Sequence, residues 1–220
     1  MSYFALIPAA GSGARLAGER SKQYRSLAGR TMLWHSLRAV LRPPIETVFV
    51  VLAAGDSDYA GEDWSGLGES GNRVEPLYCG GATRAESVHN GLVVAMAEVQ
   101  PDDWMLVHDA ARPCLPARDL AALVAECRAD AVGGILALPV ADTVKRGAKD
   151  EAGSVRVAAT EDRQMLWLAQ TPQMFRAALL VQALRAAGSA VTDEAAAIEA
   201  LGLRPRLVAG SRENIKVTWA

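Results

Sequence analysis

The sequence predicts an α/β fold built on one mostly parallel sheet with helices on both faces. Short apolar runs of strand length alternate with segments whose apolar residues recur at helical spacing, and this alternation is typical of parallel sheets. The chain has 220 residues, of which 50% are hydrophobic, enough for one sizeable core. We therefore expect a single domain over residues 1–220, with one segment, residues 141–163, that leaves the pattern.

The strands are predicted from continuous apolar runs bounded by Gly, Pro or polar residues, a pattern typical of strands buried on both faces. In chain order they are Tyr3–Ile7, Thr47–Leu52, Arg73–Tyr78, Trp104–His108, Gly134–Pro139, Leu166–Gln170 and Pro205–Val208. In an open parallel sheet, ligands bind outside the carboxyl ends of the strands. Motifs that directly follow a strand are therefore the first candidates for a binding site.

Helices are predicted from apolar residues at helical spacing between the strands. In chain order they are Thr31–Leu41, Thr83–Val99, Ala117–Ala129, Ala177–Ala187 and Asp193–Leu201. A threonine just before a helix can accept a hydrogen bond from a backbone N–H of the first turn. We therefore expect Thr31 and Thr83 to act as N-caps.

Two stretches interrupt the alternation. Residues 61–71, GEDWSGLGESG, are polar and rich in glycine and predict a surface connection. Residues 141–163 predict two short strands around a turn of Gly, Lys and Asp, without helical spacing. Because an isolated hairpin is only marginally stable in water, we expect this arm to pack on another surface, and a second copy of the chain is a good candidate.

Composition excludes several classes of protein. The formal net charge is −2 and the mean hydropathy is +0.09, so no global attraction to nucleic acid or anionic membrane is expected. No apolar stretch reaches the roughly 18 residues of a membrane span, and the N-terminus lacks the basic segment of a signal peptide. The three cysteines form no CxxC pair and the three histidines lack zinc-ligand spacing. We expect reduced thiols and a cytoplasmic location.

The first candidate motif is the loop PAAGSGARL, residues 8–16, after the first predicted strand. A P-loop is excluded because no Gly-Lys-Ser/Thr follows, and a dinucleotide fingerprint because leucine replaces its third glycine. The remaining pattern is Gly11-x-Gly13-x-Arg15, followed by Lys22. Glycine lets backbone N–H groups approach phosphate oxygens, and the two cations add full charges. The alternative is a tight turn with solvated cations.

The second motif, VHDAARP, ends the fourth predicted strand. Its Asp109 would lie at the carboxyl edge of the sheet, on the same rim as the glycine loop. A carboxylate there can bind Mg²⁺, which prefers carboxylate ligands together with substrate phosphates. The alternative is a turn or cap aspartate with Arg112 as its structural ion-pair partner. We favour a functional role for Asp109 and a structural role for Arg112.

The third motif is GGATRAESVHNGL, in which two glycines open a predicted helix that carries Arg84 and Ser87. A helix N-terminus is a ready site for an anion or a polar base, although an ordinary helix-face serine is an equally good interpretation of Ser87. Three later polar groups are Thr171, residues 192–194 and Lys216. Each alone is more typical of a cap or a solvated side chain than of a ligand.

Together these stretches resemble the 2-C-methyl-D-erythritol 4-phosphate cytidylyltransferase family of the non-mevalonate isoprenoid pathway. The matching pieces occur in the family's order over residues 3–218 and are PAAGSGARL, KQY, GG.TRAESV, VHDAARP, DTVKR, LAQTPQ.F, TDEAAAIE and NIKVT. The glycine loop alone suggests only a sugar nucleotidyltransferase, whereas VHDAARP with QTPQ and NIKVT is far more specific. The resemblance implies a single Rossmann-like nucleotidyltransferase domain.

The resemblance implies a reaction between CTP and 2-C-methyl-D-erythritol 4-phosphate that gives 4-diphosphocytidyl-2-C-methyl-D-erythritol and pyrophosphate, with Mg²⁺. The nucleophile would be an oxygen of the substrate's own phosphate, which is largely ionised at pH 7 because its second pKa is about 6. No general base is then required, which agrees with a sequence that offers no convincing His or Cys nucleophile. Positioning and neutralisation of charge at the α-phosphorus must supply the catalysis.

The resemblance also implies roles for single residues. The residues implied for catalysis are Arg15, Lys22, Arg163 and Lys216. Those implied for CTP are Pro8, Ala9, Ala10, Gly11, Gly13, Gly81, Arg84 and Ser87. Those implied for the substrate are Asp109, Thr143, Thr171 and Thr192, and Asp109 is also implied as the metal-side carboxylate. The hairpin arm of residues 141–163 is implied at the interface of a homodimer, where it reaches the neighbour's substrate.

Two features depart from the family pattern. Ala82 stands where relatives can carry a polar residue beside the base, so recognition of cytosine would depend on backbone groups. Lys216 lies four residues from the end of the sequence, where chains commonly fray, so other contacts must order it if it acts.

Two rival functions remain at this point. One is a cytidylyltransferase for another polyol phosphate, such as ribitol 5-phosphate, which would share the sheet, the glycine loop and Asp109. The other is a non-catalytic nucleotide-binding subunit. Release of pyrophosphate from CTP with each acceptor separates these alternatives.

Overall fold

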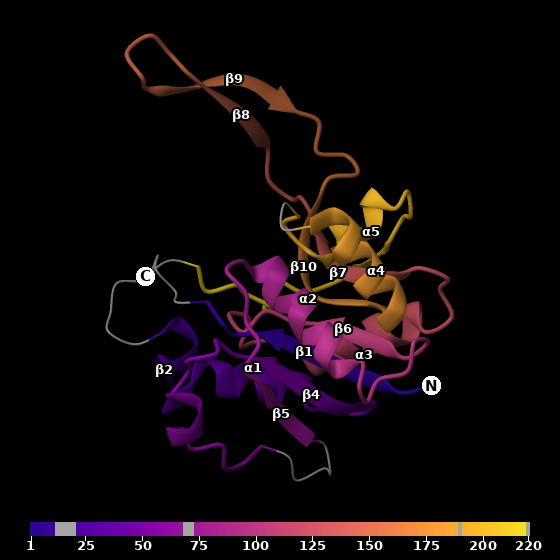
Figure 1. Cartoon of the computed structure of the whole chain (residues 1–220). Helices are drawn as coiled ribbons and strands as arrows, with labels where there is room; N and C mark the ends of the chain where they lie inside the picture. Colours follow the sequence, from indigo (N-terminus) through magenta and orange to yellow (C-terminus); the bar gives the residue numbers. More distant parts are fainter. Residues whose placement is uncertain (12–20, 68–72, 189–190, 219–220) are drawn as a thin grey trace.

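The computed structural model describes residues 1–11, 21–67, 73–188 and 191–218. Its centre is a seven-stranded sheet in the order β11-β7-β10-β6-β1-β4-β5 (Figure 1). The strands are β1 Tyr3–Pro8, β4 Ile45–Val51, β5 Arg73–Leu77, β6 Trp104–Val107, β7 Gly133–Pro139, β10 Trp167–Arg176 and β11 Arg206–Ala209. The sheet confirms the predicted fold class.

Most neighbouring strands of the sheet run parallel. β1 is parallel to β4 and β6, β4 is parallel to β5, and β7 is parallel to β11. β10 is the exception, because it is antiparallel to both β6 and β7. The carboxyl ends of β1, β4, β5 and β6 therefore meet at one edge of the sheet, where ligands bind in such folds.

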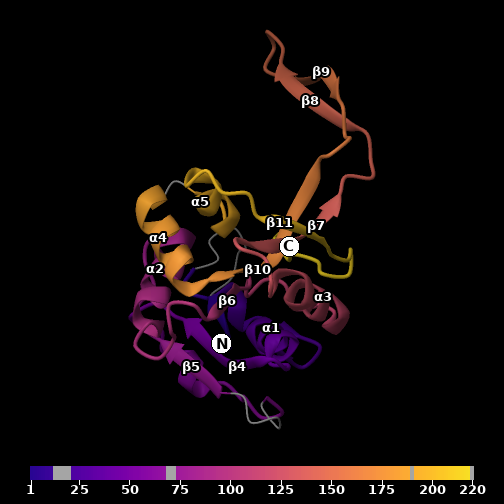
Figure 2. The same ribbon diagram turned by 90° about the vertical axis from the view of Figure 1, so that its right-hand side faces the viewer.

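The described residues form five α-helices. They are α1 Met32–Val40, α2 Arg84–Ala95, α3 Ala117–Cys127, α4 Ala177–Ala187 and α5 Glu194–Ala200. Side chains of α1 and α3 belong to one buried cluster, and those of α2, α4 and α5 belong to the other. The helices therefore cover both faces of the sheet, as Figure 2 shows.

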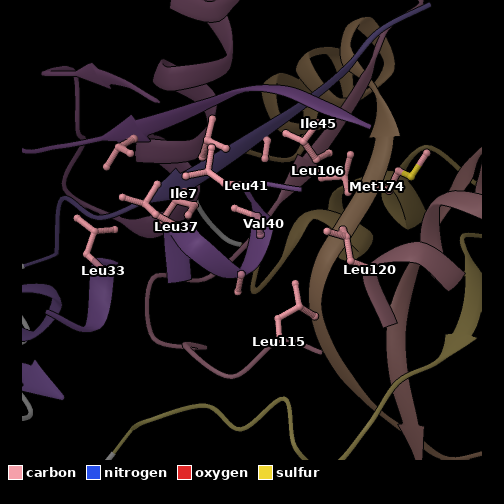
Figure 3. Packing of buried hydrophobic residues seen from close by; sticks show 14 of the residues in the cluster. Ile7, Leu33, Leu37, Val40, Leu41, Ile45, Leu106, Leu115, Leu120 and Met174 are labelled. Atoms are coloured by element: carbon pink, nitrogen blue, oxygen red, sulfur yellow. The ribbon is translucent and has the colours of Figure 1, made fainter. Parts of the chain in front are cut away.

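The two cores follow from the alternation of side chains along each strand. In β1, Ile7 belongs to the cluster under α1 and α3, whereas Leu6 belongs to the cluster under the other helices. On the first side Leu33 and Leu37 of α1 pack toward Ile7 and toward Leu106 of β6 (Figure 3). All four side chains on that side are fully buried, and each such burial contributes about 1.5–3 kcal/mol.

The helix starts agree with the sequence and some of the ends do not. The Thr31 side chain accepts from the backbone N–H of Trp34 at 3.1 Å, and Thr83 forms a capping box with Glu86, so both predicted N-caps are confirmed. Helix α2 ends at Ala95 rather than at the predicted Val99. The chain leaves the helix there through tight turns, in which the N–H groups of Ala97 and Glu98 bond to carbonyls three residues before them.

The predicted strand Leu166–Gln170 is too short, because β10 continues to Arg176. The extension contains Pro172, and proline lacks the N–H that a sheet needs. In the structure the register with β7 shifts between Ala169 and Gln173. Pro172 lies within this irregularity, so its missing donor breaks no ladder bond with β7.

The segment between β1 and α1 contains elements that the sequence patterns did not predict. Residues Lys22–Tyr24 form a 3₁₀ turn, and β2 Ser26–Leu27 pairs with β3 Arg30–Thr31 as a small antiparallel sheet. The predicted surface connection at 61–71 is exposed at residues 61, 63, 65 and 66 and partly packed at the other residues up to 67. There the indole of Trp64 lies 4.6 Å from the ring of Tyr59, between ring centroids, and packs against the core.

The segment 141–163 forms the predicted hairpin. Strand β8 Val144–Lys149 pairs antiparallel with β9 Val155–Glu161 in a separate two-stranded sheet. This arm projects away from the body of the molecule (Figures 1 and 2). Val155 and Val157 on the arm are 72% and 67% exposed, so two large apolar side chains lie open to solvent.

Across the described ranges, no helix combines the length and the apolar character that a membrane crossing requires.

Candidate active site at the carboxyl edge of the sheet

A pocket of about 710 Å³ opens at the carboxyl edge of the parallel strands. Its walls are the end of β1, the start of α2, the turn after β6, the 3₁₀ turn with its surroundings and the C-terminal segment. The lining residues are Pro8, Ala9, Ala10, Gly11, Lys22, Gln23, Met32, Gly81, Ala82, Thr83, Arg84, Ser87, Asp109, Ala110, Ala111, Lys216 and Thr218. Ten of the residues predicted from the sequence for catalysis or binding are therefore brought together here.

Small residues shape the wall beside the start of α2. A Cβ on Gly80 would collide with the Cβ of Ala10, and one on Gly81 would lie 2.5 Å from the Cβ of Glu86. The Ser87 hydroxyl accepts from the backbone N–H of Gly81 at 3.1 Å and donates to the Thr83 carbonyl at 2.9 Å. Ser87 therefore fixes the glycine turn in the structure, and contact with a base stays a prediction.

Asp109 lies at the centre of the charged part of the pocket. Its Oδ1 accepts from Nε of Arg84 at 3.0 Å, and its Oδ2 pairs with Nζ of Lys216 at 2.7 Å. Burial alone would raise the pKa of this carboxyl, but the positive charges of Arg84 and Lys216 outweigh burial and hold the pKa well below its ordinary value. Asp109 is therefore ionised throughout the neutral range.

Arg84 extends from the first turn of α2 between two carboxylates. Nη1 and Nη2 donate to the two oxygens of Glu194 at 2.7 and 3.1 Å, while Nε and Nη2 face Asp109. Burial opposes the charge of the guanidinium, yet these two carboxylates raise the pKa of Arg84 above its ordinary value. Glu194 begins α5 and is fully buried.

Hydrogen bonds hold the C-terminal segment against the body of the protein, and these contacts order Lys216. The Asn214 side-chain amide donates to the carbonyl of Thr171 at 2.8 Å, and the Asn214 carbonyl accepts from Nη1 of Arg112 at 2.6 Å. Beyond Lys216, the backbone N–H of Val217 donates to the Ala111 carbonyl at 2.9 Å. Arg112 thus has the structural role predicted for it.

Lys22 reaches the same wall from the 3₁₀ turn. Its ammonium donates to the carbonyl of Val217, next to Lys216 in the chain. Gln23, the following residue, donates from its side chain to the carbonyl of Ala9 at 2.7 Å. These two contacts tie the start of the 3₁₀ turn to β1 on one side and to the C-terminal segment on the other.

Thr171 and His108 form a buried hydrogen-bonded chain that holds the backbone of Asp109. His108 is fully buried, and its Nε2 lies 3.0 Å from the Arg112 carbonyl, so Nε2 must carry the hydrogen. Nδ1 then accepts from the Thr171 hydroxyl at 3.2 Å, and that hydroxyl oxygen accepts from the backbone N–H of Asp109 at 3.0 Å. Thr171 is buried behind the pocket wall, and its contact with substrate stays a prediction.

The burial of His108 predicts a pH dependence of stability. Burial lowers its pKa from 6.5 to about 4, so between these values the unfolded chain binds a proton that the folded chain does not. The free energy of unfolding should therefore fall as the pH drops through this range, by about 3 kcal/mol from this residue. Urea unfolding at pH 7 and at pH 4.5 measures the loss.

The matched comparison uses two histidine variants. His108→Gln should lose less stability than the parent chain between the two pH values, because the group that takes up the proton on unfolding is gone. His89→Gln, at a half-buried position of α2, controls for the loss of a histidine as such. Equal slopes in all three proteins would show that His108 does not titrate as its burial requires.

Some predicted site residues lie away from the pocket. Arg163 and Thr143 are exposed at the base of the arm, where Arg163 donates to the carbonyl of Ala141. Thr192 is exposed before α5. Gly13 and Arg15 fall outside the described residues. The site roles of all five stay predictions.

Two residues that the motif analysis did not single out for a role hold the site together. Glu194 was one of several polar residues before a helix, and its buried pairing with Arg84 joins positions 110 residues apart. Asn214 opens the NIKVT motif and is fully buried. A carboxylate at a helix start and a polar residue near a chain end are both common on surfaces, so neither carried a local signal of burial.

The described side chains of the pocket form no ready metal site. Within the described ranges, no three His, Cys, Asp or Glu side chains are arranged to hold one. Both oxygens of Asp109 already face cations, Arg84 on one side and Lys216 on the other. This donor set does not suit a protein-held Mg²⁺, which needs carboxylate oxygens open to the ion. The metal role of Asp109 therefore stays a prediction.

Comparisons with known proteins point to one family. The model of the 2-C-methyl-D-erythritol 4-phosphate cytidylyltransferase family, IspD, matches residues 3–220. A relative of that name from Dechloromonas aromatica is 55% identical over 99% of this chain and 92% of its own length. Another from Bordetella pertussis is also 55% identical, over 99% of this chain and 94% of its own length.

Solved structures agree with the sequence relatives. A crystal structure of a 4-diphosphocytidyl-2C-methyl-D-erythritol synthase superimposes with a TM-score of 0.80 at 39% identity, over 99% of this chain and 93% of that one. The enzyme from Francisella tularensis gives 0.77 at 34% identity, over 99% and 94%. The predicted family and enzyme class are confirmed: the chain belongs to the 2-C-methyl-D-erythritol 4-phosphate cytidylyltransferase family of nucleotidyltransferases.

Proposed function

We propose that the chain transfers CMP from CTP to 2-C-methyl-D-erythritol 4-phosphate and releases pyrophosphate. The observation that carries this proposal is the gathering of the family's motif residues in one pocket, where small residues line one wall and Lys22, Lys216 and Asp109 line another. Family membership supports the same reaction. The product is the CDP-linked alcohol, 4-diphosphocytidyl-2-C-methyl-D-erythritol.

The chemistry follows from the charges on the two reactants. An oxygen of the acceptor phosphate attacks the α-phosphorus of CTP, the bond from that phosphorus to the bridging oxygen breaks, and pyrophosphate leaves with the electron pair. The acceptor phosphate is largely ionised at neutral pH because its second pKa is about 6. The chain therefore needs no general base, which fits a pocket whose nearest histidine is buried with both ring nitrogens engaged.

The described residues then act through charge and position. Lys22 neutralises charge that builds up on the oxygens of the α-phosphorus, together with Arg15. Lys216 binds the acceptor phosphate, and Asp109 directs Lys216 because the two are paired at 2.7 Å. Attraction between fixed charges in a partly dry pocket costs little reorganisation during the reaction. Ala9, Ala10, Gly11 and the Gly81 turn admit the base.

A divalent cation remains part of the proposal on the strength of the family resemblance alone. Because the carboxylate of the pocket is already engaged with two cations, Mg²⁺ would enter with the triphosphate, the kind of ligand that it favours. None of the steps above is routed through the metal.

The arm supports a proposal of a homodimer. It projects from the body with Val155 and Val157 exposed, and a chain of this kind gains stability by laying the arm on a partner. In a two-fold dimer both arms are exchanged in the same way. Arg163, at the base of the arm, would then reach the acceptor phosphate in the neighbour's pocket.

Release of pyrophosphate tests the function. The purified chain is mixed with CTP and either 2-C-methyl-D-erythritol 4-phosphate or ribitol 5-phosphate, and a reaction without acceptor gives the background. Turnover with the first acceptor, at least tenfold above the second, is expected. Preference for ribitol 5-phosphate would assign the chain to another polyol phosphate, and CTP binding without turnover would make it a nucleotide-binding subunit.

A further inference from the structure

Glu194 is a fully buried carboxylate that no step of the reaction uses. It stands at the first position of α5, behind the N-cap Asp193, whose side chain accepts from the backbone N–H of Ala196 at 2.9 Å. Gln173 accepts from the backbone N–H of Ala195 at 2.8 Å, so Asp193 and Gln173 satisfy the start of the helix without Glu194. Glu194 points into the protein instead and takes both of its hydrogen bonds from the guanidinium of Arg84.

The two oxygens of Glu194 determine which way Arg84 faces. Nη1 donates to one oxygen at 2.7 Å and Nη2 to the other at 3.1 Å, a bidentate arrangement that fixes the plane and the rotation of a guanidinium. With that edge engaged, Nε is directed at Oδ1 of Asp109, at 3.0 Å. Glu194 therefore orients Arg84 so that its Nε faces Asp109.

Two carboxylates, Glu194 and Asp109, face three cations in this network. Arg84 and Lys216 are each paired with Asp109, and Glu194 is paired with Arg84. Without Glu194, Asp109 alone would face both cations, and the nearby guanidinium of Arg112 lies 3.8 Å from its Oδ2. Glu194 therefore offsets the charge of Arg84, so that Oδ2 of Asp109 stays committed to Lys216.

We propose that Glu194 is a positioning residue of the transfer reaction. It fixes the orientation of Arg84, and Arg84 in turn fixes the carboxylate of Asp109. Asp109 then determines the position of the Lys216 ammonium at the acceptor side of the pocket. The same arrangement makes Arg84 a bridge between two carboxylates rather than a mobile phosphate ligand. This inference rests on the proposed function, because it takes Lys216 and Asp109 to be the acceptor side.

The experiment is steady-state kinetics of Glu194→Gln with CTP and 2-C-methyl-D-erythritol 4-phosphate. Glutamine keeps the shape but presents one N–H₂ group to the guanidinium, so the bidentate pair is lost. We expect kcat/KM for the acceptor to fall about ten- to hundredfold, the size usual when a group that orients a site residue is removed. KM for CTP should stay within threefold. Glu199→Gln, on the exposed side of the same helix, should leave both values unchanged.

A cycle of variants separates positioning from general damage. In an Asp109→Asn background, Glu194→Gln should change the rate less than twofold, because the group through which it acts is gone. Losses that multiply in the double variant, or an equal rise of both KM values, would overturn the proposal. Where Glu194→Gln fails to fold, Glu194→Asp keeps the charge but withdraws the carboxylate by one methylene, and the same pattern is expected.

Failure of the proposed function can be distinguished from failure of the positioning role of Glu194. A parent chain that releases no pyrophosphate with this acceptor contradicts the function, whatever Glu194 does. The interaction between Glu194 and Arg84 is then measured by thermal unfolding of the ligand-free proteins. Glu194→Gln should lower the melting temperature in the parent chain, and much less in an Arg84→Gln background. Equal shifts in the two backgrounds would show that Glu194 does not act through Arg84.

Discussion

Replacing Lys22 with alanine is expected to lower kcat by about 10³-fold or more, while KM for CTP changes only a few-fold. A cation that meets charge at the reacting phosphorus stabilises the transition state more than the bound substrate, and groups in this role are worth about 10³–10⁵ in rate in related phosphoryl transfers. Lys22 is suited to it because it lines the pocket with its ammonium against the segment that carries Lys216. Rates measured over a range of CTP concentrations separate the two constants.

Two comparisons sharpen this prediction. Arg128→Ala removes an exposed cation at the end of α3, outside the pocket lining, and should leave kcat unchanged. Thermal unfolding of Lys22→Ala shows whether the contact with Val217 is also structural. A tenfold higher KM with an intact kcat would make Lys22 a uniform binder of CTP, and the catalytic assignment would be wrong.

Mixing two inactive variants is expected to restore activity, if the arm serves its neighbour. Arg163→Ala and Lys22→Ala should each be nearly inactive alone. In a mixed dimer one site inherits both defects and the other inherits neither. With equal amounts and random re-pairing, half of the dimers are mixed, so roughly a quarter of all sites should work. Pyrophosphate release before and after mixing measures the gain.

A mixture of two variants with defects in the same pocket is the control for this experiment. Lys22 and Asp109 line the same pocket of one chain, so mixing Lys22→Ala with Asp109→Asn should restore nothing. Exchange of subunits is followed with differently tagged chains. Confirmed exchange without recovery in the Arg163 mixture would show that Arg163 acts within its own chain or not at all, and the proposed shared site would be abandoned.

Short sequence patterns predicted those features of the fold that depend only on residues near one another in the chain. Thr31 and Thr83 cap their helices because an N-cap needs only its own side chain and the next turn of backbone. The pocket residues at the end of β1 and after β6 were found because chain order places both at one sheet edge once the strands are parallel. Arg112 was correctly assigned to structure.

Features that depend on distant partners could not be predicted in this way. The strand predicted at Leu166–Gln170 continues past Pro172, because the register with β7 shifts around that proline. The pairing of Asp109 with Arg84 and Lys216 was not predicted either, because these partners arrive from other elements. The burial of Glu194 depends on a partner 110 residues away, and no window of sequence contains both.

The place of β10 between β6 and β7 determines when the sheet can be completed on the ribosome. β1, β4, β5 and β6 are neighbours and can pair as soon as residue 107 has left the exit tunnel. β7 is made next, but both of its neighbours, β10 and β11, come later in the chain. At about 5–20 residues per second, β7 stays outside the exit tunnel without a partner for roughly two to seven seconds before residue 176 follows it out. During that interval its apolar residues are open to chaperones and to other nascent chains.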